Sequence, residues 1–262
     1  MKVLITGATG SLGTALVREV ASAGHQARVM SRGPRPPSTQ RDVEWAQADV
    51  ASGDGVREAV ARIDAVLHAA TDPRNSDAVD VTGTRNLVAA ARSAHVAHVV
   101  YVSIVGIDEI PIAYYKSKRA AEDIVRWSHV PFTILRATQF HSLLDGLLAT
   151  AARLPLVLLL PADFKFQTVS ASDVAGRLVA RLADGPRGRV ADFGGPDVLS
   201  LGDMARTWMD LTGIRKTLIP VPIPGRAAAG FRAGRNTAPT GARGVIGWQQ
   251  WLRRRYSSQE RQ

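Results

Sequence analysis

The N-terminus of the chain combines an apolar run with three regularly spaced glycines. Lys2-Val3-Leu4-Ile5-Thr6 leads into Gly7, Gly10 and Gly13, and residues 14–20 then show helical periodicity. A buried strand, a glycine turn and an opening helix form the geometry that holds a pyrophosphate at a helix N-terminus. We expect Gly7 to form the tight turn, Gly10 to lie beneath the phosphate and Gly13 to allow close packing of helix on strand.

The spacing is G-x-x-G-x-x-G, whereas most NAD dehydrogenases carry G-x-G-x-x-G, and glycine triplets also arise by chance. The position of this triplet between a strand and a helix favours a dinucleotide-binding loop. The residues predicted to contact the cofactor from this loop are Gly7, Thr9, Gly10, Ser11, Leu12 and Gly13.

Predicted strands and helices alternate along the first half of the chain. Strands are expected at residues 26–30, 43–47, 64–70, 98–103 and 131–136, with helices at 54–62 and 78–94 between them. This alternation predicts an α/β fold, a Rossmann-type doubly wound parallel sheet with a small C-terminal substrate-covering region. With 262 residues, of which 45% are hydrophobic, we expect a single domain. Residues 1–140 would form the dinucleotide-binding core, and residues 141–262 would complete the core and cap it.

The end of the second predicted strand indicates which dinucleotide is bound. An acid there would accept a hydrogen bond from the adenosine ribose and repel a 2′-phosphate, but this chain has Ser31 and Arg32. A hydroxyl and a forked cation suit a phosphate, and Arg35 could assist. NADP(H) is therefore favoured over NAD(H). The alternative is that Arg32 is an ordinary solvated loop arginine.

Two further strand ends supply candidate cofactor contacts. Asp49 and Val50 follow the third strand, where an acid can hold the adenine amino group and an apolar side chain can cover its ring; Asp49 could equally cap a helix. Ala69 and Ala70 end the fourth strand, and their small side chains allow a close approach of the cofactor. His68 is interpreted as a hydrogen-bonded strand-end histidine rather than a catalyst.

A serine, a tyrosine and a lysine form the candidate catalytic set. Ser103 ends the fifth strand, and Tyr114 and Lys118 lie four residues apart, which places them on one face of a helix. A nearby cation helps a phenol to exchange a proton near neutral pH, and the serine could orient a carbonyl. This set suits hydride transfer, in which the tyrosine handles the proton. Tyr115 with Arg119 is the competing register.

These segments resemble the short-chain dehydrogenase/reductase superfamily, specifically its atypical NmrA-like branch of NAD(P)H-binding proteins. The resemblance lies in residues 6–13, 100–108, 114–118 and 132–140, and extends to 173–175. It implies a Rossmann core that binds NADP(H), with Ser103, Tyr114 and Lys118 at the catalytic positions. It also implies contacts to the nicotinamide end after the sixth strand, which makes Gln139, Phe140 and His141 candidates for the substrate pocket. It does not fix the substrate.

The C-terminal third holds several local signals. Ser172 or Asp173 is expected to cap one helix and Ser200 to begin another. Prolines at 220, 222 and 224 argue against a central strand over residues 217–224. Trp248, Trp251 and Leu252 are expected to dock the C-terminus.

Charge and composition exclude several classes of function. The last 48 residues hold ten Lys/Arg and one Asp/Glu, which accounts for most of the net charge of +10. We interpret Arg253-Arg254-Arg255 and the residues after it as a solvated, frayed tail and expect no specific nucleic-acid partner. No cysteine, metal-ligand cluster or long apolar span is present, so no metal and no membrane partner are predicted. A cytoplasmic monomer or homodimer acting on a small molecule is expected.

The sequence favours an NADPH-dependent reductase of a carbonyl, quinone or activated double bond, with Tyr114 as proton donor assisted by Lys118 and Ser103. The alternative is a non-catalytic NADP(H)-binding redox-sensing regulator of the NmrA type. Such regulators typically lack the tyrosine–lysine pair, which this chain keeps. A sugar-nucleotide epimerase fits poorly, because those relatives usually have a longer substrate domain.

Overall fold

The computed structural model describes residues 1–36 and 43–257, and its chain divides into two units that exchange segments along the sequence. Unit 1 comprises Met1–Ser103, Ala113–Arg136 and Val174–Ala191. Unit 2 comprises Ile104–Ile112, Ala137–Asp173 and Asp192–Gln262. The predicted division at residue 140 stays a prediction.

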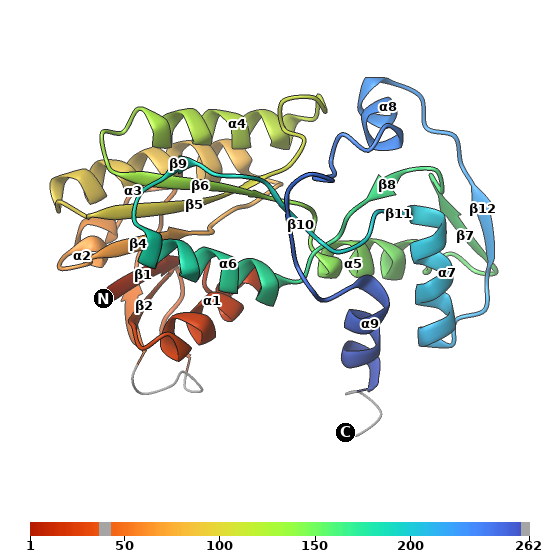
Figure 1. Ribbon diagram of the computed structural model, residues 1–262, viewed down its shortest axis with the longest axis horizontal. Coiled ribbons are helices and arrows are strands. Elements are labelled where there is room, and N and C mark those ends of the chain that lie inside the picture. The colour runs from red at the N-terminus through yellow and green to blue at the C-terminus, as the bar shows by residue number, and fades with distance from the viewer. Residues whose placement is uncertain (37–42, 258–262) are drawn as a thin grey trace. The chain divides into compact units, whose positions relative to one another are not determined.

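A parallel sheet forms the centre of unit 1 (Figure 1). Its strands run in the order β3-β2-β1-β4-β5-β6-β9, so the order reverses between β1 and β4. This is the strand order of a Rossmann fold, and the predicted doubly wound sheet is confirmed. The strands are β1 (Lys2–Thr6), β2 (Gln26–Ser31), β3 (Glu44–Gln47), β4 (Ala65–His68), β5 (His98–Ile104), β6 (Phe132–Ala137) and β9 (Gly188–Arg189).

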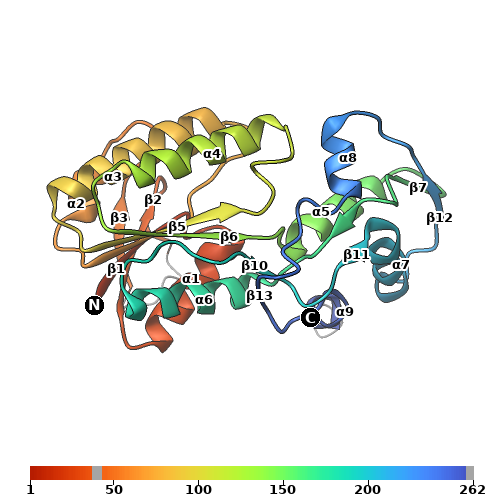
Figure 2. The same cartoon turned by 45° about the horizontal axis from the view of Figure 1, so that its top comes forward.

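Helices cover both faces of this sheet (Figure 2). On one face lie α1 (Ser11–Ser22) and α6 (Ala171–Asp184). On the other lie α2 (Val56–Val60), α3 (Gly83–Ser93) and α4 (Ala113–Arg126). The segment η1 (Asp77–Thr82) is a π-helical stretch directly before α3. Such stretches are rare and frequently occur at functional sites.

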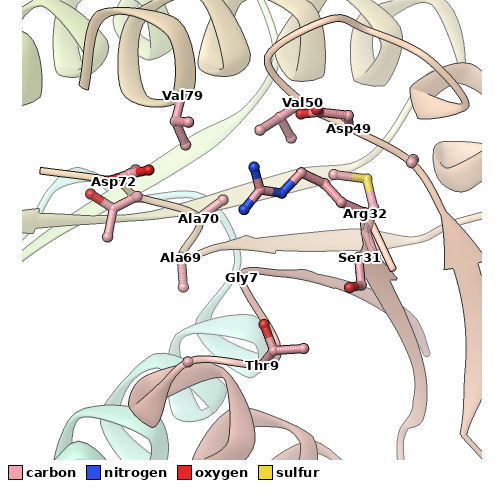
Figure 3. A pocket seen from close by; sticks show the side chains of 14 residues that line it. Gly7, Thr9, Ser31, Arg32, Asp49, Val50, Ala69, Ala70, Asp72 and Val79 are labelled. Carbon is pink, nitrogen blue, oxygen red and sulfur yellow. The ribbon is translucent and has the colours of Figure 1, made fainter. Parts of the chain in front are cut away.

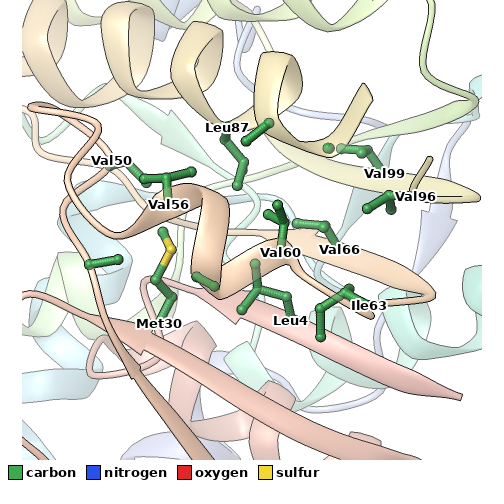
Figure 4. Packing of buried hydrophobic residues seen from close by; sticks show 14 of the residues in the cluster. Leu4, Met30, Val50, Val56, Val60, Ile63, Val66, Leu87, Val96 and Val99 are labelled. Carbon is green, nitrogen blue, oxygen red and sulfur yellow. The ribbon is translucent and has the colours of Figure 1, made fainter. Parts of the chain in front are cut away.

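The central strands are apolar because both of their faces are buried. Val3, Leu4 and Ile5 of β1 are completely buried, and β4 is buried along its whole length. Figure 4 shows the cluster between the sheet and helices α2 and α3, in which Leu4 and Leu87 take part. Each buried leucine of this kind contributes about 2 kcal/mol of transfer free energy. This core fixes the strand ends that carry the candidate site.

In the described residues, unit 2 consists of short strands, four helices and the start of a fifth. Its strands pair as β7 with β12 (parallel), β8 with β11 (antiparallel) and β10 with β13 (parallel). The bounds of its strands are β7 (Val157–Leu160), β8 (Lys165–Phe166), β10 (Phe193–Gly194), β11 (Leu199–Ser200), β12 (Thr217–Pro220) and β13 (Ala242–Arg243). Its helices are α5 (His141–Ala151), α7 (Leu201–Thr212), α8 (Arg226–Arg232) and α9 (Trp248–Ser257), and the first residues of α6 belong to it as well.

The prediction of a frayed C-terminal tail is wrong for the residues that the structure describes. Helix α9 continues through Ser257, because the buried carboxylate of Asp145 anchors its last turns. Arg255 forms an ion pair with Asp145 at 2.8 Å, and the Tyr256 hydroxyl donates to the same carboxylate at 2.7 Å. Residues 258–262 of the predicted tail lie outside the described residues. Trp248 and Leu252 are buried, as expected for a docked helix.

One predicted helix cap is confirmed and another is wrong. Ser200 accepts a hydrogen bond from the Asp203 amide at the start of α7. At the start of α6 the Asp173 amide instead donates to Ser170, so neither Ser172 nor Asp173 is the cap. The Asp173 carboxylate accepts from the amides of Val245 and Ile246.

Candidate functional site

A cavity of about 260 Å³ lies at the carboxyl ends of β1, β2 and β4, beside the reversal of strand order (Figure 3). Ligands bind at this position in open α/β sheets. The predicted cofactor residues that line it are Gly7, Thr9, Gly10, Ser31, Arg32, Asp49, Val50, Ala69 and Ala70. The sequence did not single out the other lining residues, which are Met30, Ala48, Thr71, Asp72 and Val79.

The glycine loop has the close packing that its spacing predicted. Gly7 has φ +68°, and a Cβ there would lie 2.6 Å from the Ala69 carbonyl oxygen. A Cβ on Gly13 would lie 2.2 Å from the carbonyl oxygen of Gly7. Ser11, Leu12 and Gly13 therefore form the first turn of α1 rather than the lining of the cavity.

The N-terminus of α1 is suited to an anion. Gly10 is the N-cap, it supplies no side-chain hydrogen bond, and the first turn contains no acid. The first amides of the helix therefore remain available to a phosphate, and the helix dipole favours one. The loop fits the diphosphate of a dinucleotide on this observation.

Arg32 supplies the positive charge of the cavity. Its side chain extends from the end of β2, and Figure 3 shows its guanidinium reaching in the direction of Val50 and Ala70. Ser31, beside it, accepts a hydrogen bond from the Gly33 amide at 3.3 Å. Arg35 does not line this cavity.

Asp49 is not a helix cap, since α2 begins after Gly55, and its predicted contact with adenine stays a prediction. Its carboxylate accepts the Ala51 amide at 2.8 Å, which stabilises the turn after β3, and the residue also lines the cavity. Asn86 donates to the carbonyl oxygens of Val50 and Ala51 and so fixes the same turn from α3.

A chain of hydrogen bonds runs beneath the floor of the cavity. The Thr6 hydroxyl accepts the amides of Ala69 and Ala70, so its proton goes to Nδ1 of His68, at 2.7 Å. His68 therefore carries its own proton on Nε2, which lies 3.0 Å from the Thr84 hydroxyl. Burial lowers the pKa of His68 to about 3, and the charge of Lys118 adds to this effect. His68 is a neutral, fully bonded histidine, as interpreted from the sequence.

Asp80 is a buried acid that the sequence analysis did not single out. Its carboxylate accepts the Thr71 hydroxyl at 2.7 Å and the Asp72 amide at 3.2 Å, and it lies 3.5 Å from the Lys118 ammonium. It is completely buried in η1. A signal was present, because Asp80 and Thr84 share helical spacing with the apolar Leu87.

Tyr114 lies at the edge of the same network. Its hydroxyl is 2.7 Å from that of Thr71, whose single proton goes to Asp80, so Tyr114 is the donor in this bond. Burial raises the pKa of the Tyr114 phenol well above its ordinary value, and the charge of Asp80 raises it further. The competing Tyr115 is only 4% exposed, which favours Tyr114 as the residue able to reach a ligand.

Lys118 is held away from the phenol that it was expected to activate. Its ammonium donates to the Val102 carbonyl at 2.8 Å and lies 4.4 Å from the centre of the Tyr101 ring. Burial lowers the pKa of Lys118, and Asp80 opposes this shift. Lys118 thus connects to Tyr114 through Asp80 and Thr71.

Ser103 is 2% exposed and lies beside the buried carboxylate of Glu122. Arg136 forms a two-point contact with that carboxylate, at 2.7 and 2.8 Å, and Arg126 adds a third bond at 2.9 Å. Burial opposes ionisation of Glu122, but Arg136, Ser103 and Arg126 together hold its pKa below the ordinary value. The structure does not bring Ser103 to the Tyr114 hydroxyl by a hydrogen bond.

The three substrate-pocket candidates lie in unit 2. His141 is 1% exposed, with Nδ1 2.8 Å from the Thr168 hydroxyl and Nε2 2.9 Å from the Ile246 carbonyl. Gln139 accepts from Asn236 at 3.1 Å. Phe140 is half-buried. Contact of these residues with a substrate stays a prediction.

Within residues 1–36 and 43–257, no group of three or more acids and histidines is placed to hold a metal ion. None of the helices in this part of the chain has the length and apolar character needed to cross a bilayer.

Comparison with known proteins gives a consistent result. Residues 7–185 match a family described as NAD(P)H-binding. A ceramide reductase of Caulobacter vibrioides is 30% identical over 252 residues, covering 87% of this chain and 76% of that protein.

Solved structures share the fold at lower identity. MoeE5 in complex with UDP-glucuronic acid and NAD has a TM-score of 0.76 at 20% identity and covers 100% of this chain and 99% of that one. An NADPH-dependent quinone oxidoreductase from Escherichia coli has a TM-score of 0.74 at 18% identity, covering 97% and 99%. One of these proteins holds NAD and the other is named for NADPH, so the shared fold does not decide between the two cofactors.

Proposed function

This chain belongs to the NAD(P)H-binding family of the short-chain dehydrogenase/reductase superfamily, and on that premise we propose that it is an NADPH-dependent reductase. Its substrate is a small organic molecule with a carbonyl, a quinone or an activated double bond. The name of the Caulobacter relative, a ceramide reductase, supports the reductase class. The observation that carries the proposal is the Tyr114 hydroxyl, bonded to Thr71 in the wall of the nucleotide cavity.

The residues around the cavity fit NADPH. The amides of the glycine loop and of the start of α1 bind the diphosphate. Arg32 binds the 2′-phosphate through a charge-assisted hydrogen bond. Asp49 and Val50 lie where the adenine would be held. When bound, the reduced nicotinamide supplies the hydride.

Tyr114 supplies the proton to the reduced substrate. The phenol carries its proton at neutral pH, as reduction requires of a donor, although burial raises its pKa and makes it a weaker acid. Thr71 and Asp80 orient the hydroxyl, and Lys118 balances the charge of Asp80. Ser103, which is 2% exposed, stays the candidate for orienting the substrate carbonyl.

The substitution Tyr114→Phe tests the proposal. We expect kcat for NADPH oxidation, measured with a panel of quinones and ketones, to fall about 100-fold or more, since this is the usual contribution of a general acid. The dissociation constant for NADPH should change less than about twofold, because the phenol is not among the cavity-lining residues. Tyr115→Phe is the matched control and should retain activity.

An unchanged kcat in Tyr114→Phe would remove the proposed proton donor. NADPH binding by the wild-type protein without turnover of any acceptor would instead favour the redox-sensing regulator. The two results are separable because binding and turnover are measured independently.

A further inference from the structure

Strands β7 and β12 expose an apolar face on unit 2. Leu158 and Leu160 point into the core, while Leu159 between them is 41% exposed. Leu159 is paired in register with Ile219, which is also 41% exposed. Figure 1 shows the two strands side by side. The sheet therefore has one buried face and one apolar face turned outward.

The outward face continues beyond the two strands. The Val221 amide donates to the Leu160 carbonyl at 2.8 Å, so the pairing extends past β12 and the odd-numbered residues stay in phase. Val221 and Ile223 are 36% and 41% exposed. Leu156, before β7, is 81% exposed. We define the β7–β12 face as Leu156, Leu159, Ile219, Val221 and Ile223. Contiguous exposed apolar residues of this kind mark protein or membrane contacts.

The outer edge of β12 is closed to another strand. The amides of Thr217 and Val221 donate to β7, so the even-numbered positions face the open edge. Residues 220, 222 and 224 are prolines, which have no amide proton. A second chain therefore lacks the amides that it would need to continue regular pairing along this edge.

The charge around the β7–β12 face is mainly positive. Segments 151–163 and 213–232 contain five basic residues and one acid, Asp163, which forms an ion pair with Arg232. Arg153 precedes β7, and Arg215 and Lys216 precede β12; because the strands are parallel, these three cations lie at the same end of the face. Arg226 follows its other end. Arg153, Arg215 and Arg226 are exposed, and no carboxylate pairs with them in the described part of the chain.

We propose that the β7–β12 face adsorbs to an anionic lipid surface. The apolar side chains enter the headgroup–acyl boundary, and the flanking cations contact lipid phosphates. The excess of positive charge beside the face matches an anionic lipid surface, and the prolines disfavour a second copy added by strand pairing at β12. The sequence predicted no membrane partner; adsorption of this kind needs no membrane-spanning helix.

Vesicle sedimentation of the full chain tests the proposal. We expect binding to phosphatidylcholine vesicles containing phosphatidylglycerol, weak binding to phosphatidylcholine alone, and loss of binding as salt screens the cations over a Debye length of about 10 Å. No binding to either vesicle at low salt would overturn the proposal.

Paired variants separate the apolar from the charged contribution. Leu159→Ser with Ile219→Ser should lower vesicle binding at least tenfold, whereas Trp127→Ser, which removes an exposed apolar residue of unit 1, should not. Arg215→Gln with Arg226→Gln should lower it about thirtyfold, because each cation contributes about fivefold. The matched control is Arg57→Gln with Arg92→Gln, which alters two exposed arginines of unit 1.

Circular dichroism establishes that each variant is folded. Undiminished vesicle binding by both face variants would overturn the proposal. So would a dimer in size-exclusion chromatography that Leu159→Ser with Ile219→Ser dissociates, because the face would then be a contact between copies. All these measurements are independent of turnover, so failure of the proposed reductase activity leaves them interpretable.

Discussion

At the scale of single residues, His68 makes the stability of the fold depend on pH. It is completely buried, both of its ring nitrogens are within hydrogen-bond distance of threonine hydroxyls, and its pKa is lowered to about 3 from 6.5. The unfolded chain therefore binds a proton below pH 6.5 that the folded chain does not. Stability from this group is present above pH 6.5 and is lost as the pH falls.

We expect the free energy of unfolding to fall by about 2 kcal/mol between pH 7 and pH 5 on account of His68. Urea denaturation at the two pH values measures it. In His68→Gln this part of the decrease in unfolding free energy should disappear. The part due to His98 and His141 should remain, because burial lowers their pKa values as well. An equal decrease in both proteins would contradict the assignment.

At the same scale, the proposed preference for NADPH depends on Arg32. We expect Arg32→Ala to weaken NADPH binding about 10- to 100-fold, the equivalent of a charged hydrogen bond of about 1.5–3 kcal/mol, and to leave NADH binding unchanged. Fluorescence titration with both nucleotides measures this. Arg35→Ala, which alters an arginine outside the cavity, is the control. Equal losses for the two nucleotides would refute a contact with the 2′-phosphate.

At the scale of elements, the junction of β1 and α1 depends on two kinds of glycine. Gly13 is needed for packing, because its Cβ would collide with the Gly7 carbonyl. Gly10 is different: it is an extended N-cap, and a Cβ there would meet only the Gly7 carbonyl at 3.4 Å. Packing therefore does not require glycine at position 10, and we propose that the space beside it admits the phosphate.

The two glycines should respond differently to substitution. We expect Gly13→Ala to lower the free energy of unfolding by about 1–3 kcal/mol, the usual effect of overpacking, and to weaken NADPH binding. Gly10→Ala should keep its stability within about 0.5 kcal/mol and still weaken NADPH binding. Thermal unfolding and nucleotide titration measure the pair. A stable Gly13→Ala variant would contradict the packing role.

At the scale of the whole molecule, the polypeptide chain crosses several times between the two units. The chain passes between unit 1 and unit 2 five times, and β6 itself runs from Arg136 in the first into Ala137 in the second. Each unit has its own buried cluster. Because β6 contains residues of both units, unfolding of one unit disrupts a strand of the other, and we expect the units to unfold together.

Matched core truncations test this cooperativity. Leu252→Ala in unit 2 and Leu87→Ala in unit 1 both remove completely buried side chains and should each cost about 2–5 kcal/mol. Native-state hydrogen exchange should show lower protection in both units for either variant. Protection lost only in the unit that carries the substitution would show two independently folding domains.

Several features of this protein depend only on neighbouring residues and could be predicted from them. The glycine loop, the buried strands, the strand-end positions of Arg32 and Ala69, and the Ser200 cap all follow from spacing over a few residues. The parallel sheet followed as well, because alternating strands and helices have few other ways to pack.

The pairing of polar groups that lie far apart in the chain follows from the packing of the fold and not from local spacing. Tyr114 meets Thr71, which is 43 residues away, and Lys118 meets Asp80 instead of the tyrosine on its own helix. The basic C-terminal residues are helical because Asp145, 111 residues before Tyr256, holds them. Burial makes such pairings obligatory, since an unpaired polar group in the core costs about 1–3 kcal/mol. Periodicity along the chain carries no information about which distant residue forms a hydrogen bond with a given buried polar group.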